Sequence, residues 1–291
     1  MLVTKSARPE PVVNRSGTLY IVSTPIGNLE DITLRALKVL KEVYLIAAED
    51  TRRTKKLLNA YQIHTPLTSL FEHNELKKSG VLIAKILAGE NVAYVSDAGT
   101  PGISDPGYLL IREALAHDIN IIAIPGVCAA IAALSISGLP TDSFVFHGFL
   151  PAKPGKRQHF IESLEEETKT MIFYESPNRL MATLRDILVA LGNRRVVVSR
   201  ELTKVYEETS RGMLSDVIDA WCDRPLKGEI TLAIAGKGKD DASYSEDEIQ
   251  VLLWRYKENT ELSERDLIER ISRETKVSRK TVYRVVMKAK S

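Results

Sequence analysis

The chain has 291 residues, of which 44% are apolar and 27% are charged, and its formal net charge is +2. These values are ordinary for a soluble protein with a sizeable core, and they exclude a disordered or strongly basic chain. Any binding of nucleic acid therefore depends on local clusters of basic residues. Cys128 and Cys222 are the only cysteines and lie far apart, which excludes a disulfide framework and fits a reducing cytoplasm.

The pattern along the chain predicts an α/β fold with two αβα domains. Residues 1–16 lack the apolar run of a signal peptide and are expected to form a flexible arm. Strand-like and helix-like segments alternate over residues 17–138, which predicts a mostly parallel sheet covered by helices. Over residues 139–236 the strands are more closely spaced, which predicts a mixed sheet. A polar linker over residues 237–245 follows.

One stretch, residues 119–141, contains no charged residue and is long enough to raise the question of a membrane helix. Pro125 and Gly126 interrupt it. A buried strand over residues 120–124 and a helix over residues 127–137 account for the same composition. No membrane segment is therefore predicted.

A loop rich in Gly and Pro, Val95–Gly107, lies between a strand-like run and a helix-like run. Its glycines permit close backbone approach, and its prolines stiffen the turns. Small ligands bind at such loops, because these follow the carboxyl ends of the strands in open α/β sheets. The alternative is an ordinary surface turn, but the Pro-Gly pairs and the two Asp residues favour a ligand site.

The last segment, residues 246–291, is predicted to be a small all-α domain. Apolar residues recur there at helical spacing, and Val277–Val286, with Ser278 at its cap, resembles the recognition helix of a helix-turn-helix. Eight basic residues lie between Arg270 and Ser291 against a single acid. Such a run is often a solvated helix face. The turn pattern favours RNA binding instead, with three candidate contacts: Arg279, Lys280 and Arg284.

Six separate segments carry a resemblance to a known family. They are Thr24–Thr33, Ala48–Arg52, Ser96–Gly107, Ile124–Cys128, Tyr174–Arg179 and Ser199–Lys204. Together they resemble the tetrapyrrole-methylase-like family of S-adenosylmethionine (SAM) methyltransferases, and in particular its RNA-modifying branch. Agreement in several loops is far more specific than one Gly-rich match. Where the tetrapyrrole branch has an acid in its first loop, this chain has Asn28, which counts against a porphyrinoid substrate.

The resemblance implies that SAM lies in a cleft between the two αβα domains and is held largely by backbone atoms. From the residues themselves, Asp97 is the acid best placed to hold the ligand, and Gly99 allows the backbone to approach it. The resemblance implicates Asp97 too and adds six more binding residues: Pro25, Thr100, Cys128, Ala129, Glu175 and Thr231. No His, Cys and Asp cluster has the spacing of metal ligands, so no metal is predicted.

Methyl transfer to a ribose hydroxyl calls for a group that handles its proton. The candidates follow strand-like runs and are Glu49, Asp50 and Lys204. The two acids could equally cap the following helix. Four arginines suit phosphate contacts in the same cleft. They are Arg52, Arg53, Arg179 and Arg200.

The resemblance implies an enzyme that 2′-O-methylates a cytidine ribose in the decoding region of small-subunit (16S) ribosomal RNA. It also implies a homodimer that acts on the small ribosomal subunit, and the two separated cysteines indicate a cytoplasmic location. Two alternatives stay open at this point. One is a methyltransferase acting on a tetrapyrrole or another small molecule, and the other is a non-enzymatic RNA-binding assembly factor.

Overall fold

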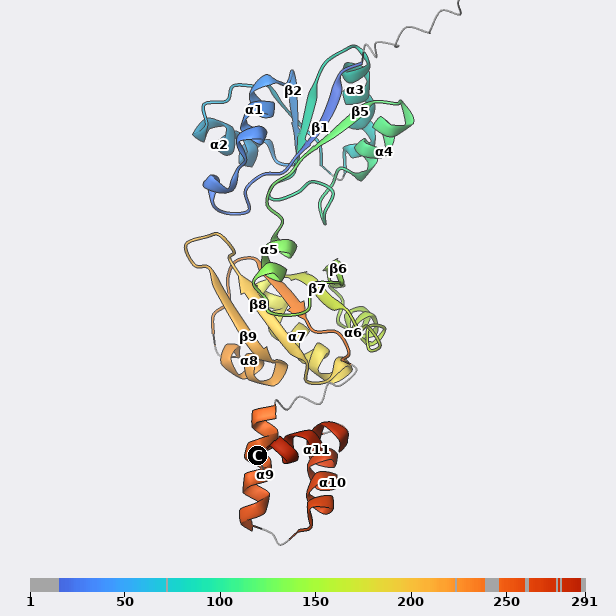
Figure 1. Cartoon of the computed structure of the whole chain (residues 1–291). Helices are drawn as coiled ribbons and strands as arrows, with labels where there is room; N and C mark the ends of the chain where they lie inside the picture. Colours follow the sequence, from blue (N-terminus) through green and yellow to red (C-terminus); the bar gives the residue numbers. More distant parts are fainter. Residues whose placement is uncertain are drawn as a thin grey trace, which may run out of the picture.

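The computed structural model describes residues 16–71, 73–222, 224–238, 246–259, 262–275, 277 and 279–288. The predicted arm, apart from residue 16, and most of the predicted linker lie outside these residues. Within them the structure confirms the α/β class, with two α/β domains and a helical domain (Figure 1). No helix in this part of the chain is both long and apolar enough to cross a membrane.

The first domain holds a five-stranded parallel sheet in the order β3-β2-β4-β1-β5, as the alternation in the sequence predicted. Buried strands such as β2 are apolar on both faces, because helices cover both. Helices α3 and α4 pack on one face, and α1 and α2 pack on the other. The elements are β1 (Thr18–Val22), η1 (Leu29–Asp31), α1 (Leu34–Glu42), β2 (Leu45–Ala48), α2 (Thr51–Ala60), β3 (Leu67–Ser69), α3 (Glu75–Leu87), β4 (Val92–Val95), α4 (Tyr108–Ala116) and β5 (Asn120–Ile124).

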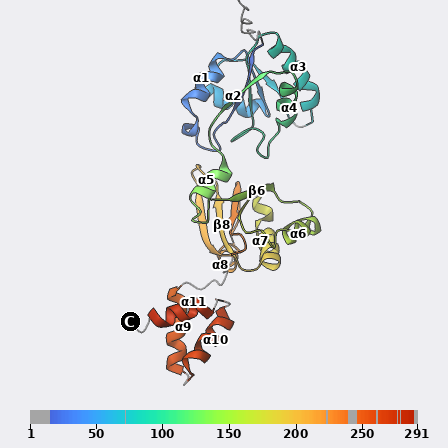
Figure 2. The same cartoon turned by 45° about the vertical axis from the view of Figure 1, so that its right-hand side comes forward.

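The second domain holds a five-stranded mixed sheet in the order β6-β7-β10-β8-β9. Strands β6 and β7 are parallel and the other pairs are antiparallel, which confirms the predicted mixed sheet. Figure 2 shows α6 and α7 beside this sheet. The elements are α5 (Ala129–Ser135), β6 (Phe144–Phe149), α6 (Pro154–Glu162), β7 (Thr170–Glu175), α7 (Pro177–Leu191), β8 (Arg195–Arg200), β9 (Glu208–Met213), α8 (Leu214–Trp221) and β10 (Ile230–Ile234).

Helix α5 connects the two domains. The chain leaves the carboxyl end of β5 and runs toward the second domain, where Ala130 and Leu134 of α5 pack with Ile172 of β7. On the same helix, Ala133 packs with Ile26 from the first domain and Leu202 from the second. The carboxyl ends of the first sheet's strands therefore face the second domain, so the loops that follow them lie at the junction.

Three helices form the C-terminal domain: α9 (Glu246–Asn259), α10 (Glu264–Thr275) and α11 (Arg279–Lys288). Its core draws on all three helices and on the turn before α11, with Ile249, Leu253, Ile271, Val277, Val282, Val285 and Val286 buried together. The short connection between α10 and α11 agrees with the predicted helix-turn-helix pattern. The predicted cap, Ser278, lies outside the described residues.

Candidate active site

Three loops that follow β1, β4 and β5 are tied together at the edge of the first sheet. Thr24 and Gly99 exchange two backbone hydrogen bonds of 2.9 Å each. The Thr100 hydroxyl donates to the Val127 carbonyl at 3.2 Å and lies 3.0 Å from the Ser23 hydroxyl oxygen. Gly99 adopts a φ of +79°, a conformation that a side chain would strain. The three Gly- and Pro-containing turns therefore converge, as their places in the sequence predicted.

A buried carboxylate on α3 fixes the far end of the β4–α4 loop. Oε1 of Glu75 accepts hydrogen bonds from the N–H groups of Gly107, Leu109 and Leu110, at 3.1, 2.9 and 3.2 Å. These are the unsatisfied donors at the start of α4, where a negative charge is also favourable. Gly107 has a φ of +124° and packs on the ring of Tyr94, so close that an added Cβ would lie 2.5 Å from it.

A cavity of about 430 Å³ opens between the two domains, beside these loops. This volume falls in the range of small-molecule sites. Both domains contribute to its wall, and five carboxylic acids are among the lining residues. The lining residues include Ile26, Glu49, Arg53, Asp97, Gly99, Thr100, Asp105, Cys128, Ala129, Phe149, Tyr174, Glu175, Leu202, Glu229 and Thr231.

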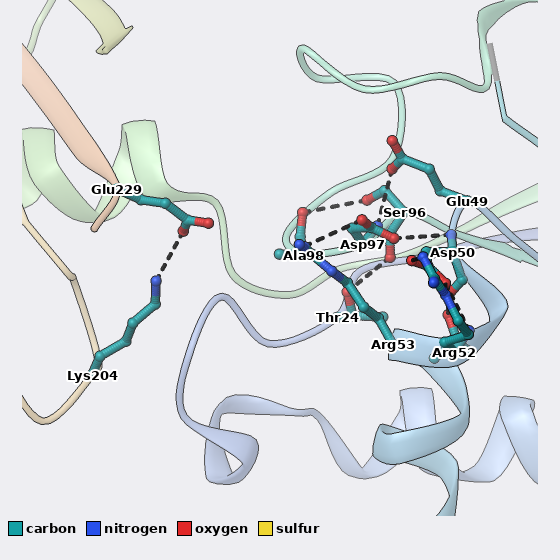
Figure 3. A network of polar contacts seen from close by, with 11 residues as sticks. Thr24, Glu49, Asp50, Arg52, Arg53, Ser96, Asp97, Ala98, Lys204 and Glu229 are labelled. Carbon is teal, nitrogen blue, oxygen red and sulfur yellow. Dashed lines mark hydrogen bonds and ion pairs between the residues drawn. The ribbon is translucent and has the colours of Figure 1, made fainter. Parts of the chain in front are cut away.

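Asp97 organises the acidic wall of the first domain (Figure 3). Its Oδ1 accepts the Asp50 N–H at 2.9 Å, and its Oδ2 lies 3.3 Å from the Arg53 guanidinium. Its own N–H donates to Glu49 Oε2 at 3.1 Å. A carboxylate has about four acceptor positions, so Asp97 retains capacity for a ligand. Burial raises the pKa of Glu49, and the neighbouring Asp97 adds to this, although a backbone hydrogen bond opposes it.

Asp50 caps helix α2. Its Oδ1 accepts the backbone N–H of Arg52 at 2.8 Å, and the Arg52 guanidinium pairs with Oδ2 at 2.8 Å. These hydrogen bonds from Arg52 hold the pKa of Asp50 well below its usual value. The capping alternative therefore describes Asp50, whereas Glu49 lines the cavity.

Lys204 lies at the tip of the β8–β9 hairpin and reaches the first domain. Its Nζ is 2.8 Å from Glu201 Oε1 and 3.0 Å from Glu229 Oε2. Figure 3 shows the contact with Glu229. Its aliphatic chain lies over Gly27, where an added Cβ would come within 2.3 Å of Cγ. Burial lowers the pKa of Lys204, but the two acidic partners outweigh burial and raise it. Lys204 is therefore held as a cation between the domains.

Seven of the eight predicted SAM-binding residues line the cavity: Asp97, Gly99, Thr100, Cys128, Ala129, Glu175 and Thr231. Pro25 is not among the lining residues, whereas its neighbour Ile26 is. The Glu175 side chain is fully buried, and its carboxylate accepts hydrogen bonds from Arg179 at 2.8 Å and from the Thr183 hydroxyl at 2.6 Å. That carboxylate is therefore already occupied within the second domain.

The four predicted phosphate-binding arginines differ in their surroundings. Arg53 lines the cavity, and the side chain of Arg52 is 88% exposed. Arg179 is paired with Glu175, and Arg200 lies 3.1 Å from Glu208. All four guanidinium groups lie in ion pairs, since Arg52 also pairs with Asp50 and Arg53 with Asp97. The difference is exposure: the side chains of Arg52 and Arg53 are 88% and 63% exposed, and those of Arg179 and Arg200 are 25% and 18% exposed.

Of the cavity residues that were not singled out from the sequence, four carry an aromatic or acidic side chain: Phe149, Asp105, Tyr174 and Glu229. Phe149 is 60% exposed and meets the Tyr174 ring edge-on, with 5.6 Å between the ring centroids. Asp105 lies within the Gly- and Pro-rich loop, so its position in the sequence could have indicated that it lines the ligand site. The other three come from the second domain. Tyr174 begins the segment Tyr174–Arg179 that resembles the family, whereas only the packing of the domains brings Phe149 and Glu229 to the site. In the described part of the chain, no three His, Cys, Asp or Glu side chains are grouped to hold a metal ion.

Comparison with known proteins places the chain in a family. The model of the tetrapyrrole (corrin/porphyrin) methylases matches residues 18–218. These residues cover the first α/β domain and extend through the second as far as α8. A protein from Synechocystis sp. is 46% identical over 275 residues, covering 92% of this chain and 97% of the relative. It is called ribosomal RNA small subunit methyltransferase I. The chain belongs to that family, a branch of the tetrapyrrole methylases.

Two more relatives carry the same name. The protein from Halalkalibacterium halodurans is 52% identical over 223 residues, 77% of this chain and 77% of the relative. The protein from Thermotoga maritima is 48% identical over 221 residues, which are 76% of this chain but 99% of the relative. A family member can therefore consist almost wholly of the matched part, without the remaining quarter of this chain.

Solved structures of more distantly similar proteins share the fold. Cobalt precorrin-4 methyltransferase, a cobalamin biosynthetic enzyme, superposes with a TM-score of 0.57 at 17% identity, covering 75% of this chain and 94% of that one. Uroporphyrin-III C-methyltransferase from Thermus thermophilus, complexed with S-adenosyl homocysteine, superposes with a TM-score of 0.52 at 17% identity. The superposition covers 75% of this chain and 97% of that one. At these identities the likeness concerns the fold.

Proposed function

We propose that this protein transfers a methyl group from SAM to a nucleotide of small-subunit ribosomal RNA. The observation that carries the proposal is the 46% identity, over 92% of the chain, to a relative named for this activity. The cavity between the domains supports it, because the loops that build its wall contain the segments that resemble the family. The small-molecule and non-enzymatic alternatives lack such support.

The cavity suits SAM in size and charge. When bound, SAM supplies an electrophilic methyl group on a positively charged sulfur. The carboxylates of Glu49 and Asp97 favour a cationic ligand. Ile26, Leu202 and Phe149 supply apolar wall that excludes water. Gly99 brings the backbone close to the ligand, and Asp97 has acceptor positions left to hold its polar groups.

The acceptor that we propose is the 2′-hydroxyl of a cytidine ribose in the decoding region of 16S RNA. An enzyme that acts on a stacked nucleotide must draw it out of its helix or use an exposed one, and aromatic rings commonly receive the base. Phe149, exposed at the cavity, is such a ring. Arg52 and Arg53 supply positive charge at the same edge of the first sheet for the RNA phosphates. The homodimer remains a prediction from the resemblance, and the cytoplasmic location remains one from the cysteine content.

Two measurements test the proposal. Calorimetry with SAM should show binding without added metal, and Asp97→Ala should weaken it, because the variant loses a polar anchor and loosens Asp50. Labelled methyl groups from SAM should appear on the ribose of one cytidine, and a single 2′-deoxy substitution there should abolish transfer. Label on the base would overturn the 2′-hydroxyl assignment. Absence of SAM binding would favour the non-enzymatic alternative, and transfer to a tetrapyrrole would favour the small-molecule one.

A further inference from the structure

Asp105 differs from the other acids of the cavity. Of the five carboxylic acids that line it, four are bound by a backbone N–H or a cation. Glu49 accepts the Asp97 N–H, Asp97 pairs with Arg53, Glu175 pairs with Arg179, and Glu229 pairs with Lys204. Asp105 is hydrogen-bonded to the Ser96 side chain and has no cationic partner among the described residues. It is thus the carboxylate best able to accept a proton from a bound substrate.

The position of Asp105 is fixed from two sides. Its neighbour Ser104 has a φ of +63° and touches the second domain, since a Cβ added at Gly148 would lie 2.7 Å from the Ser104 hydroxyl oxygen. On the other side, Glu75 binds the N–H of Gly107 at 3.1 Å. The loop therefore holds Asp105 in place between the two domains, at the cavity, as a reacting group requires.

The surroundings of Asp105 make it more basic than an exposed carboxylate. Burial raises its pKa to about 6, and the charges of Glu49, Asp97 and Glu229 act in the same direction. Tyr94 and Tyr174 also face it, and both are neutral because burial raises their pKa values. At neutral pH Asp105 is mostly ionised and ready to accept a proton, which is the condition for an efficient general base.

We propose that Asp105 is the catalytic base that takes the proton of the methylated ribose hydroxyl, an inference that rests on the proposed function. As the hydroxyl oxygen forms its bond to the methyl group, the O–H bond breaks and the proton passes to the Asp105 carboxylate. The bond between sulfur and the methyl carbon breaks with its electron pair left on sulfur, giving a neutral thioether. Asp105 then releases the proton to solvent.

The test compares Asp105→Asn with the wild-type protein in single-turnover methyl transfer to small ribosomal subunits from cells that lack this protein. Asp105→Asn should lower the rate on the order of 10²-fold, the usual contribution of a general base, while SAM and subunit affinities stay unchanged. The wild-type rate should rise with pH up to about 6 and then level off. This rise should vanish in Asp105→Asn and persist, at a lower rate, in Asp105→Glu.

Two further variants sharpen the result. Asp142→Asn makes the same change at an exposed position outside the cavity and should keep both the wild-type rate and its pH profile. Glu49→Gln removes the competing acid. Asp105 is not the base if the rate of Asp105→Asn still rises with pH, or if this variant is slower only because it binds SAM more weakly. The same conclusion follows if Glu49→Gln, rather than Asp105→Asn, removes the rise of the rate with pH. Label on a group other than the 2′-hydroxyl in the wild-type reaction would refute the proposed function itself, which is a separate result.

Discussion

His147 shows how one side chain can link stability to pH. It lies on β6, with its ring stacked on Phe173 at 5.1 Å between centroids and edge-on to Phe160 at 5.5 Å. Its Nε2 is buried and has no hydrogen-bond partner in the described part of the chain. Burial lowers the pKa of His147, and the negative charge of Glu167 opposes this only in part. His147 therefore contributes to the core as a neutral ring.

We predict that acid destabilises the protein through His147. Because its pKa is lower in the folded than in the unfolded state, its contribution is present above the unfolded pKa of about 6.5 and is lost as pH falls through the folded pKa. His147→Phe should keep the stacking and reduce the fall in unfolding free energy between about pH 7 and pH 5. Urea unfolding at a series of pH values between about 5 and 7 measures this fall in unfolding free energy. His159→Gln, a change at a 90% exposed histidine, is the control and should leave the fall intact.

The cavity residues that the strand pattern alone predicted are those that directly follow strands, whereas Glu175 and Thr231 were predicted from the resemblance to the family. Glu49, Asp97 and Gly99 lie at the carboxyl ends of parallel strands, whose loops meet for reasons of topology alone. Phe149 and Glu229 could not be found in this way, because their convergence depends on how one domain packs against the other. Only the three-dimensional structure could show that Asp50 caps helix α2 and that Glu49 lines the cavity, because the local sequence around a capping acid and a cavity acid is the same.

At the scale of single elements, the start of helix α4 depends on a residue 32 positions away. The helix begins at Tyr108 after a glycine that has no side chain to cap it, and Glu75 of α3 provides the acceptor instead. Glu75 itself is 4% exposed. The strand and helix pattern predicted α4 at the right place in the sequence. It could not predict the cap, because a contact between two helices leaves no local signal.

We predict that Glu75→Ala destabilises the protein and loosens the loop that carries Asp97, Gly99 and Asp105. Three N–H groups, two of them buried and one partly buried, would lose their acceptor, which costs on the order of 3 kcal/mol. SAM affinity should fall as well, because the loop would have to be ordered on binding. Urea unfolding and calorimetry measure the two effects. Glu75→Gln retains one acceptor oxygen and should cost less, whereas an equal loss in both variants would point to packing rather than capping.

At the scale of the whole molecule, the C-terminal domain lies wholly beyond the match to the family model, which ends at residue 218. The relative from Thermotoga maritima matches 76% of this chain over 99% of its own length, so a relative of the same name lacks about a quarter of this chain. The helical domain has its own core and carries exposed residues on α11, including Arg279, Tyr283 and Arg284. Arg279 is 2.9 Å from Glu269 but remains 67% exposed. The side chain of Lys280 lies outside the described residues.

We predict that the C-terminal domain strengthens RNA binding without taking part in SAM binding. Basic residues that contact phosphates release counterions, so their contribution falls as salt rises. Deleting residues 243–291 should leave SAM affinity intact, weaken binding to small ribosomal subunits and flatten the dependence of that binding on salt. Reversing the charges of Arg279, Lys280 and Arg284 together should reproduce most of the loss. Subunit affinities measured across a salt series for the three proteins decide the matter. An unchanged slope in the deletion variant would make the basic run a solvated helix face, and the RNA would then be held by the α/β domains alone.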